Sequence, residues 1–372
     1  MDIVNIKSES DENDSYSEET YNITSWGADL SFRELIFMYK DEELLKPEIQ
    51  RNYVWDKTEA SRFIESLLMG LPVPSIFLAR LPNEKQLIID GYQRIMTVYD
   101  YVMTGIFSKD NKIFKLSNSE LINRKWRGKA YSELNPDDQR RIRNTTIHAI
   151  IFEQKHPKND DTSLYQIFER INTSGRTLTP QEIRNCVYQG PFNTSLIELN
   201  KHESWRTLFG SKNPDERMRD IEFILRFFAL NTDMIRNNKA MQISLKKELN
   251  LFMKSDDSQK PEVIRTREET FIKTMDFIYK NMGGNAFHNI SKTGDQYIER
   301  FHPTIFDAIS ISTAYALERQ PDLVLNGANK KKRDLLNDED FKTFITERTT
   351  NIKHINGRIG IALRYLYEMD YC

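Results

Sequence analysis

The chain has 372 residues but only two cysteines, no long apolar run and almost no excess of either charge. Cys186 and Cys372 are too few and too far apart for a disulfide framework or a thiolate metal site. No apolar stretch approaches the ~20 residues that cross a bilayer, and the first residues lack the basic and apolar regions of a secretory signal. We therefore expect a cytoplasmic protein without membrane contact.

Familiar catalytic signatures are missing as well. The sequence contains no Walker A loop, no HExxH zinc helix and no GxSxG nucleophile turn. The histidines are scattered along the chain, at His148, His156, His202, His288, His302 and His354. They form no cluster of the kind that an HNH-type nuclease needs for its base and its metal. If the protein acts on DNA, we expect it either to nick weakly or to recruit a separate nuclease.

The formal net charge of -2 at pH 7 argues against a protein held to nucleic acid by bulk electrostatics, but it leaves local DNA contact open. Two basic clusters are candidates for such contact. The first includes Arg124, Lys125, Arg127, Lys129 and Arg141, and the second includes Lys330, Lys331 and Lys332. A solvated surface is the alternative interpretation of both clusters.

Composition and periodicity divide the chain into three parts. Residues 8–20 carry six acids and no base, so we expect residues 1–22 to form a disordered tail. Residues 23–190 mix strand and helix patterns, whereas residues 191–372 have helical periodicity almost throughout, as at 221–230, 271–282, 305–317 and 359–369. The predicted fold class is α+β, with a small mixed sheet followed by a helical domain.

Local side-chain signals predict where several helices begin and end. Ser31 and Glu34 form a capping box, and a helix that begins there must end before Pro47. A second helix is expected to begin after Asp56 and to end at Gly70. Thr179-Pro180-Gln181-Glu182 supplies an N-cap, an N1 proline and an N3 glutamate, which predicts a third helix start.

Short apolar runs predict strands over 75–79, 86–90, 113–116 and 145–152. Between the second and third of these runs, the spacing of apolar residues predicts a helix over 95–105.

The strand–turn–helix segment that contains Asp90, Gly91 and Arg94 is the main candidate site. The first N–H groups of a helix have no intrahelical acceptor and lie at the positive end of its dipole, so phosphate fits there. The Arg94 guanidinium can fork onto phosphate oxygens, and Asp90 can hold Mg²⁺ or accept from a sugar hydroxyl. Alternatively, Asp90-Gly91 is an ordinary turn and Arg94 only pairs with Asp90.

Four blocks of this sequence resemble the N-terminal domain family of GmrSD-type, modification-dependent restriction systems. The blocks are Arg51–Trp55, Ile64–Pro74, Asp90–Arg94 and Phe168–Asn185, and the resemblance covers about residues 25–230. The family motif reads Asp-Gly-Gln-Gln-Arg, but Tyr92 stands at its third position here. Tyr92 either stacks on a base or packs against the fold.

The resemblance implies a ParB/sulfiredoxin-like fold that binds a nucleotide at a Gly-x-x-Arg turn. It further implies an NTPase with Mg²⁺ as cofactor, which regulates or performs cleavage of DNA, including modified DNA. The implied catalytic residues are Asp90, Gln93 and Arg94, with Asp90 as metal ligand. The implied nucleotide-binding residues are Arg51, Gly91, Tyr92, Arg94, Arg170, Asn172, Gly175 and Arg184.

Alternatives remain for several of these assignments. Arg51 is equally well explained by a surface ion pair, and Arg170 and Arg184 can tie the two halves of the chain together through carboxylates. For the whole chain, the alternative is a non-catalytic module that binds DNA or a partner and works with a separately encoded nuclease. A direct endonuclease is a third interpretation. The oligomeric state is left open.

Overall fold

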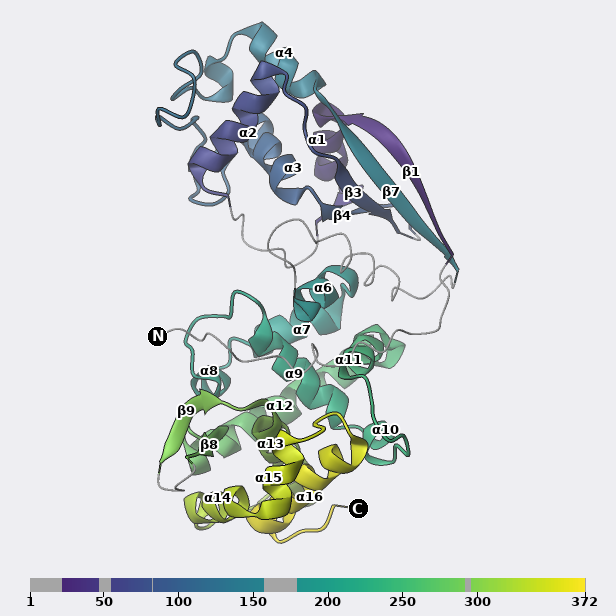
Figure 1. Ribbon diagram of the computed structural model, residues 1–372, viewed down its shortest axis with the longest axis vertical. Coiled ribbons are helices and arrows are strands. Elements are labelled where there is room, and N and C mark those ends of the chain that lie inside the picture. Colours follow the sequence, from purple (N-terminus) through teal and green to yellow (C-terminus); the bar gives the residue numbers. More distant parts are fainter. Residues whose placement is uncertain (1–21, 47–54, 82, 157–178, 292–295, 372) are drawn as a thin grey trace. The chain divides into compact units, whose positions relative to one another are not determined.

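The computed structural model describes residues 22–46, 55–81, 83–156, 179–291 and 296–371. The chain divides into two compact units (Figure 1). Of the described residues, those from 22 to 156 belong to the sheet unit, and those of 179–184 and from 188 onward belong to the helical unit. The predicted acidic tail lies outside the described residues, apart from Asn22.

A five-stranded mixed sheet organises the sheet unit, in the order β1-β7-β3-β4-β2. These strands are β1 (Asn22–Ser31), β2 (Leu44–Leu45), β3 (Ile76–Arg80), β4 (Gln86–Asp90) and β7 (Thr146–His156). β7 pairs antiparallel with β1 and parallel with β3, and β4 pairs antiparallel with β3 and parallel with β2. The small mixed sheet that the sequence predicts is therefore confirmed.

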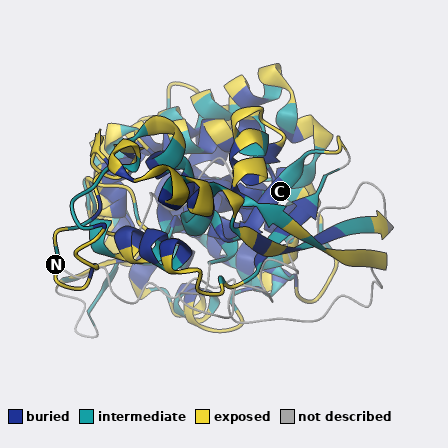
Figure 2. Cartoon of the chain, turned by 90° about the horizontal axis from the view of Figure 1, so that it is seen from above, coloured by how far each residue is buried: buried dark blue, intermediate teal, exposed yellow. Residues whose placement is uncertain are grey.

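The edge strand β1 was not predicted as a strand. Most of its residues are exposed, so it lacks the apolar–polar alternation of a half-buried strand. It pairs with β7 over its whole length, from Asn22 opposite His156 to Ser31 opposite Thr146. Figure 2 shows the projecting end of this ribbon coloured as exposed or intermediate.

Helices pack on one face of the sheet, and their ends follow the predicted caps. In α1 (Phe32–Lys40), Ser31 and Glu34 form the expected capping box. In α2 (Lys57–Met69), Asp56 caps the start, and Gly70 ends the helix with a φ of 74°. With α4 (Pro136–Asn144) and the helix after β4, they bury a core that includes Leu35, Ile64, Leu78, Ile95 and Ile147.

The helix after β4 changes its winding before it ends. α3 (Tyr92–Tyr99) continues as the π-helical turn η2 (Asp100–Thr104) and stops at Gly105, which has a φ of 66°. The predicted end at Gly105 is confirmed, but the π turn was not predicted. The buried Asp100 accepts from the backbone N–H and the hydroxyl of Ser108, each at 2.8 Å. Burial raises the pKa of the Asp100 carboxyl.

A small hairpin follows η2. It consists of β5 (Ile106–Phe107) and β6 (Lys112–Ile113), and the 3₁₀ turn η3 (Tyr131–Glu133) leads from there toward α4. The strand predicted over 113–116 is therefore present only in part.

The helical unit confirms the predicted helical segments and adds a β-hairpin, β8 (His288–Ile290) with β9 (Tyr297–Phe301), that was not predicted. Its helices are α6 (Pro180–Val187), α7 (Pro191–Leu199), α8 (Glu203–Phe209), α9 (Arg219–Leu230), α10 (Asp233–Arg236), α11 (Leu245–Lys254), α12 (Pro261–Met282), α13 (Pro303–Arg319), α14 (Ala328–Asn337), α15 (Glu339–Thr346) and α16 (Ile352–Tyr367), with the 3₁₀ turn η4 (Asp256–Gln259) between α11 and α12.

A buried ionic triad joins three of these helices. Asp307 of α13 accepts from Arg226 of α9 at 2.7 and 2.5 Å and from Arg358 of α16 at 2.7 Å. All three side chains are at most 1% exposed. Two guanidinium groups therefore share one carboxylate in a region without bulk water, where removing one partner is costly.

We predict that Asp307→Asn lowers the free energy of unfolding by about 3–5 kcal/mol, because it leaves two buried guanidinium groups without their shared carboxylate. Urea unfolding followed by circular dichroism measures this change. Asp334→Asn, at an exposed position of α14, is the control and should unfold like the wild type. Equal unfolding midpoints for both variants would contradict the conclusion that Asp307 balances the charges of Arg226 and Arg358.

Candidate functional site

Gly91 links β4 to α3 through a tight turn. Its φ of 102° is in the left-handed region, which favours glycine. A Cβ atom at this position would lie 2.3 Å from Cγ2 of Ile76 in β3. Gly91 therefore lets the turn approach the neighbouring strand β3 closely, and this approach fixes where α3 begins.

Arg94 clamps this turn to the segment that enters β3. Its Nη2 donates to Asp90 Oδ2 at 2.6 Å, while its Nη1 donates to the carbonyl oxygens of Pro74 and Ser75 at 2.5 and 3.1 Å. The Arg94 side chain is 13% exposed, whereas that of Asp90 is 40% exposed. The ion pair that the sequence left as an alternative is therefore formed, and Arg94 has internal partners at both terminal nitrogens.

Tyr92 and Gln93, between Gly91 and Arg94, face the protein. Gln93 Oε1 accepts from the backbone N–H of Trp55 at 3.4 Å. Tyr92 packs against the core of the sheet unit, and burial raises the pKa of its phenol to about 12. Of the two roles considered for Tyr92, packing is the one that this geometry supports.

The start of α3 keeps features that suit an anion. Its N-cap is a glycine, and no side chain of the described residues caps its first turn. The half-exposed Asp90 carboxylate lies beside this helix start and uses one oxygen for Arg94. No group of three or more His, Cys, Asp or Glu within the described ranges could hold a metal. A magnesium ion here would rely on Asp90 and on substrate phosphates, which is a common donor set for this ion.

We predict that Gly91→Ala destabilises the protein more than Gly105→Ala does. Both glycines have positive φ, but a Cβ at Gly105 would meet nothing within 4 Å. The backbone strain of about 1–3 kcal/mol is therefore common to both variants, and only Gly91→Ala adds the clash with Ile76. Thermal unfolding measures the difference, and adding Ile76→Ala should reduce the excess cost. Equal costs for the two glycines would contradict the close-approach argument.

Residues 32–189 match the family model of the GmrSD restriction endonuclease N-terminal domain. These residues belong to that family. The domain indicates a component of a restriction or anti-phage defence system, with DNA as its target. No curated protein and no solved structure matches the chain. The ParB/sulfiredoxin-like fold therefore stays a prediction, while the mixed α/β architecture with a helical C-terminal part is shown.

The last family block includes Thr179–Arg184 at the start of α6, which belong to the helical unit. Thr179 caps α6 in the predicted capping box with Glu182. Arg184 is fully buried: its Nε donates to Asn250 at 2.8 Å, and its Nη1 lies 3.6 Å from Glu222 of α9. This geometry supports a structural tie through a carboxylate. Arg51, Arg170, Asn172 and Gly175 lie outside the described residues, so their predicted roles stay predictions.

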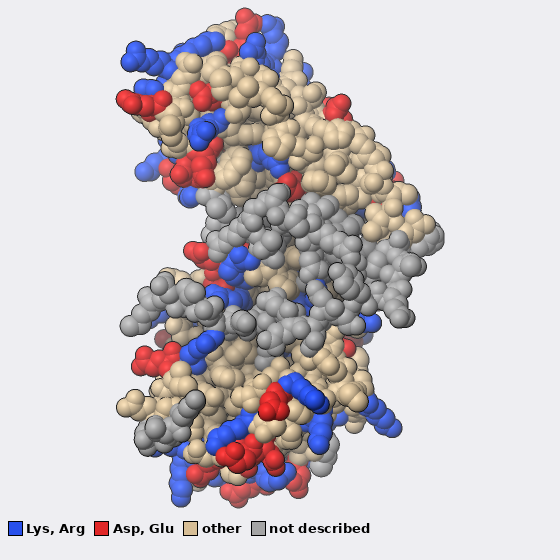
Figure 3. Space-filling model, in the orientation of Figure 1, with Lys and Arg blue, Asp and Glu red and all other residues tan. Residues whose placement is uncertain are grey.

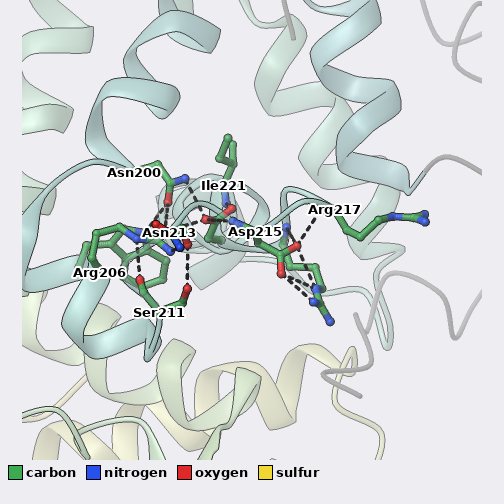
Figure 4. Close-up of polar contacts among 10 residues, drawn as sticks. Asn200, Arg206, Ser211, Asn213, Asp215, Arg217 and Ile221 are labelled. Atoms are coloured by element: carbon green, nitrogen blue, oxygen red, sulfur yellow. Dashed lines mark hydrogen bonds and ion pairs between the residues drawn. The ribbon is translucent and has the colours of Figure 1, made fainter. Parts of the chain in front are cut away.

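A polar network holds the loop that contacts α6 (Figure 4). Arg206 of α8 donates to Asp220 at 2.6 Å and to Asn200 at 2.8 Å, and its other nitrogens bond carbonyl oxygens of the loop between α8 and α9. From the same loop, the Arg217 carbonyl oxygen accepts from Thr179 at 3.0 Å, and Arg217 Nε lies 3.2 Å from Glu182. The start of α6 is thus fixed within the helical unit.

The first predicted basic cluster is partly engaged by the protein itself. Lys125 pairs with Asp138 at 3.1 Å, Arg127 donates to the Ile122 carbonyl, and Arg141 donates to the Leu68 carbonyl. Arg124 is exposed and Lys129 half-buried. Figure 3 shows Lys and Arg side chains along the outer edge of the unit that contains α4, with Asp and Glu among them.

In the second predicted basic cluster, the structure contradicts the prediction at one residue, Lys332. Lys330 is exposed and Lys331 pairs with Glu368 at 2.8 Å, but Lys332 is only 1% exposed. Its ammonium donates to the Asn285 carbonyl and lies 4.0 Å from the centre of the Tyr297 ring. The prediction that Lys332 contacts DNA at the surface is therefore wrong. Burial lowers the pKa of Lys332 to about 7.

We predict that Lys332→Met removes part of the pH dependence of stability. In the unfolded chain a lysine has a pKa of about 10.4. Between pH 7 and that pKa, the unfolded chain therefore binds more protons at this site than the folded chain does. The free energy of unfolding should therefore rise with pH through this window and change little below it. Denaturant unfolding at several pH values measures the slope. Lys330→Met on the same helix should keep the wild-type slope, and an unchanged slope in Lys332→Met would refute the burial argument.

Within the described residues, no helix is both long and apolar enough to cross a membrane.

Proposed function

We propose that the chain is the nucleoside-triphosphate-binding, hydrolysing component of a DNA restriction system, and that the GmrSD N-terminal domain holds the triphosphate at the start of α3. One observation carries the proposal: β4 delivers a half-exposed carboxylate, Asp90, beside a helix start that no described side chain caps. Uncapped helix starts bind phosphate through backbone N–H groups and the helix dipole. A neighbouring carboxylate suits the magnesium ion that accompanies a triphosphate.

The ion pair between Asp90 and Arg94 gives these two residues linked roles. In the structure each satisfies the charge of the other. A bound magnesium triphosphate offers Asp90 a cation and Arg94 an anion, so the pair can exchange its internal contact for two contacts with substrate. Arg94 keeps its carbonyl partners Pro74 and Ser75 during this exchange and stays in place. The magnesium ion would offset the charge of the phosphates during transfer to water.

Gln93 is assigned to orienting the attacking water or a phosphate. Its side chain lies in the first turn of α3 and already bonds the backbone at Trp55. That contact fixes the amide beside the helix start, which is where a water aligned with the terminal phosphate has to be held.

We predict that Asp90→Asn lowers magnesium-dependent phosphate release by about 100-fold, the usual cost of losing one electrostatic group in a site. Asparagine keeps an oxygen for Arg94, so the melting temperature should stay close to that of the wild type. Arg94→Ala should lower both phosphate release and melting temperature, because it also removes the clamp on Pro74 and Ser75.

Asp215 and Arg219 supply a matched control. They form an ion pair with the same spacing in sequence and the same distance of 2.6 Å, but in the helical unit. Arg219→Ala should therefore keep the specific activity of its folded fraction. Equal phosphate release by wild type, Asp90→Asn and Arg94→Ala would overturn the assignment of the site.

A second candidate function is a non-catalytic, DNA-binding module that works with a separate nuclease. The observation that favours it is the internal engagement of both terminal nitrogens of Arg94. Absence of triphosphate binding, together with DNA binding that persists in Asp90→Asn, would select this function. Incubation of the protein with modified and unmodified plasmid tests whether the chain itself nicks DNA.

A further inference from the structure

The β5–β6 hairpin of the GmrSD domain has one buried and one exposed apolar face. Ile106 and Ile113 are paired directly across the two strands, so their side chains lie on the same face. They are 38% and 62% exposed, whereas Phe107 and Phe114 are buried. Successive side chains of a strand point to opposite faces, which explains why the phenylalanines are buried while the two isoleucines are exposed to solvent.

The hairpin is held firmly from its buried side. The rings of Phe107 and Phe114 lie 4.8 Å apart, and the ring of Tyr101 lies 5.1 Å from that of Phe114. The Tyr101 hydroxyl donates to the Lys129 carbonyl at 3.0 Å. The contact of Asp100 with Ser108 fixes the start of the turn between the strands. The exposed isoleucines therefore stand on a rigid support and are not part of a loose loop.

Backbone hydrogen bonds bring a second basic segment beside the hairpin. The Leu116 N–H donates to Lys129, and the Gly128 N–H donates back to Leu116, at 3.0 and 3.1 Å. Lys115 and Ala130 form an antiparallel bridge at the same place. The basic cluster predicted from the sequence is thus continuous in space with the hairpin, which the sequence did not indicate.

Positive charge accompanies the exposed apolar side chains. Residues 106–130 contain seven Lys or Arg and two acidic residues, in a chain whose net charge is -2. Glu133 and Asp138 pair with Lys115 and Lys125 and leave an excess of positive charge. Leu121, 64% exposed, is a further apolar side chain of this stretch, and Met103, 40% exposed, lies just before it in η2.

This combination fits a nucleic acid better than a protein. Lysine is depleted in protein–protein interfaces, whereas Lys and Arg supply most phosphate contacts in DNA complexes. Apolar side chains in such complexes contact thymine methyl groups, and isoleucine and methionine also wedge between base steps. The target indicated by the family is DNA.

We propose that the β5–β6 hairpin is a DNA-contacting element, in which the pair Ile106–Ile113 packs against bases in a groove. The exposed Lys112 is paired with Phe107 and so lies on the other face of the hairpin, from which its long side chain neutralises a flanking phosphate. The proposal rests on the DNA-restriction part of the proposed function and does not depend on the triphosphate site.

The test is the affinity of the full chain for a fluorescent DNA duplex, measured by anisotropy over a range of salt concentrations. Lys112→Gln should weaken binding and reduce the slope of log affinity against log salt by about 1, because one phosphate contact is lost. The double variant Ile106→Ser/Ile113→Ser should weaken binding about 10-fold or more with an unchanged slope, because apolar contacts release no counterions.

Two control variants are matched to these. Ile298→Ser removes an exposed isoleucine of β9 in the helical unit, and Lys353→Gln removes an exposed lysine of α16. Both should bind DNA like the wild type. All five substituted positions are exposed, so every variant should melt close to the wild-type temperature. If the double isoleucine variant does not, Ile113→Thr alone replaces it.

The outcomes separate this proposal from the proposed function. If the wild type binds DNA and the hairpin variants bind equally well, the hairpin proposal is overturned and the proposed function stands. If the wild type binds no DNA, both the hairpin proposal and the DNA part of the proposed function fail, while phosphate release still tests the triphosphate site. If the isoleucine variant changes only self-association, measured by light scattering, the face is a protein interface and the proposal is overturned.

Discussion

The geometry of the proposed site depends on the contacts that the Arg94 guanidinium makes. It joins the end of β4, the start of α3 and the segment before β3 through one carboxylate and two carbonyl oxygens. Gly91 makes this arrangement possible, because any larger residue would collide with Ile76. The turn is therefore rigid before any ligand arrives, and a ligand at the start of α3 would meet a backbone that is already in place.

Local signals in the sequence predicted the elements around this turn. The capping boxes at Ser31, Asp56 and Thr179 act through neighbouring residues, so they could be recognised without knowing the fold. The partners of Arg94 at Pro74 and Ser75 are about twenty residues away, and only the pairing of β3 with β4 brings them close. The sequence thus predicted the strand–turn–helix segment that contains Asp90, Gly91 and Arg94, but not the engagement of Arg94 by the protein backbone.

The missed strand β1 and the wrong prediction for Lys332 have the same origin, because both depend on contacts between distant residues. β1 has few buried residues, so its pairing with β7 left no periodic signal. Lys332 lies in a run of basic residues that is typical of a solvated surface, and its burial results from contacts with Asn285 and Tyr297 near the β8–β9 hairpin. In both cases the structure depends on contacts between distant parts of the chain, which the local sequence pattern does not encode.

Asp307 and Asp220 of the helical unit differ from Asp90 of the sheet unit in the exposure of their carboxylates. Asp307 and Asp220 are fully buried and saturated by arginines and amides of the same unit, which suits a scaffold. Asp90, by contrast, keeps its carboxylate half-exposed next to a helix start that no described side chain caps. This difference in exposure is the physical reason to place chemistry at the turn after β4 and not in the helical unit.

The most direct measurement is a crystal structure of the protein with magnesium and a non-hydrolysable nucleoside triphosphate. We predict phosphate oxygens at the first backbone N–H groups of α3, with Asp90 turned from Arg94 toward the metal. An intact contact between Asp90 and Arg94, with the triphosphate bound elsewhere or not at all, would contradict it.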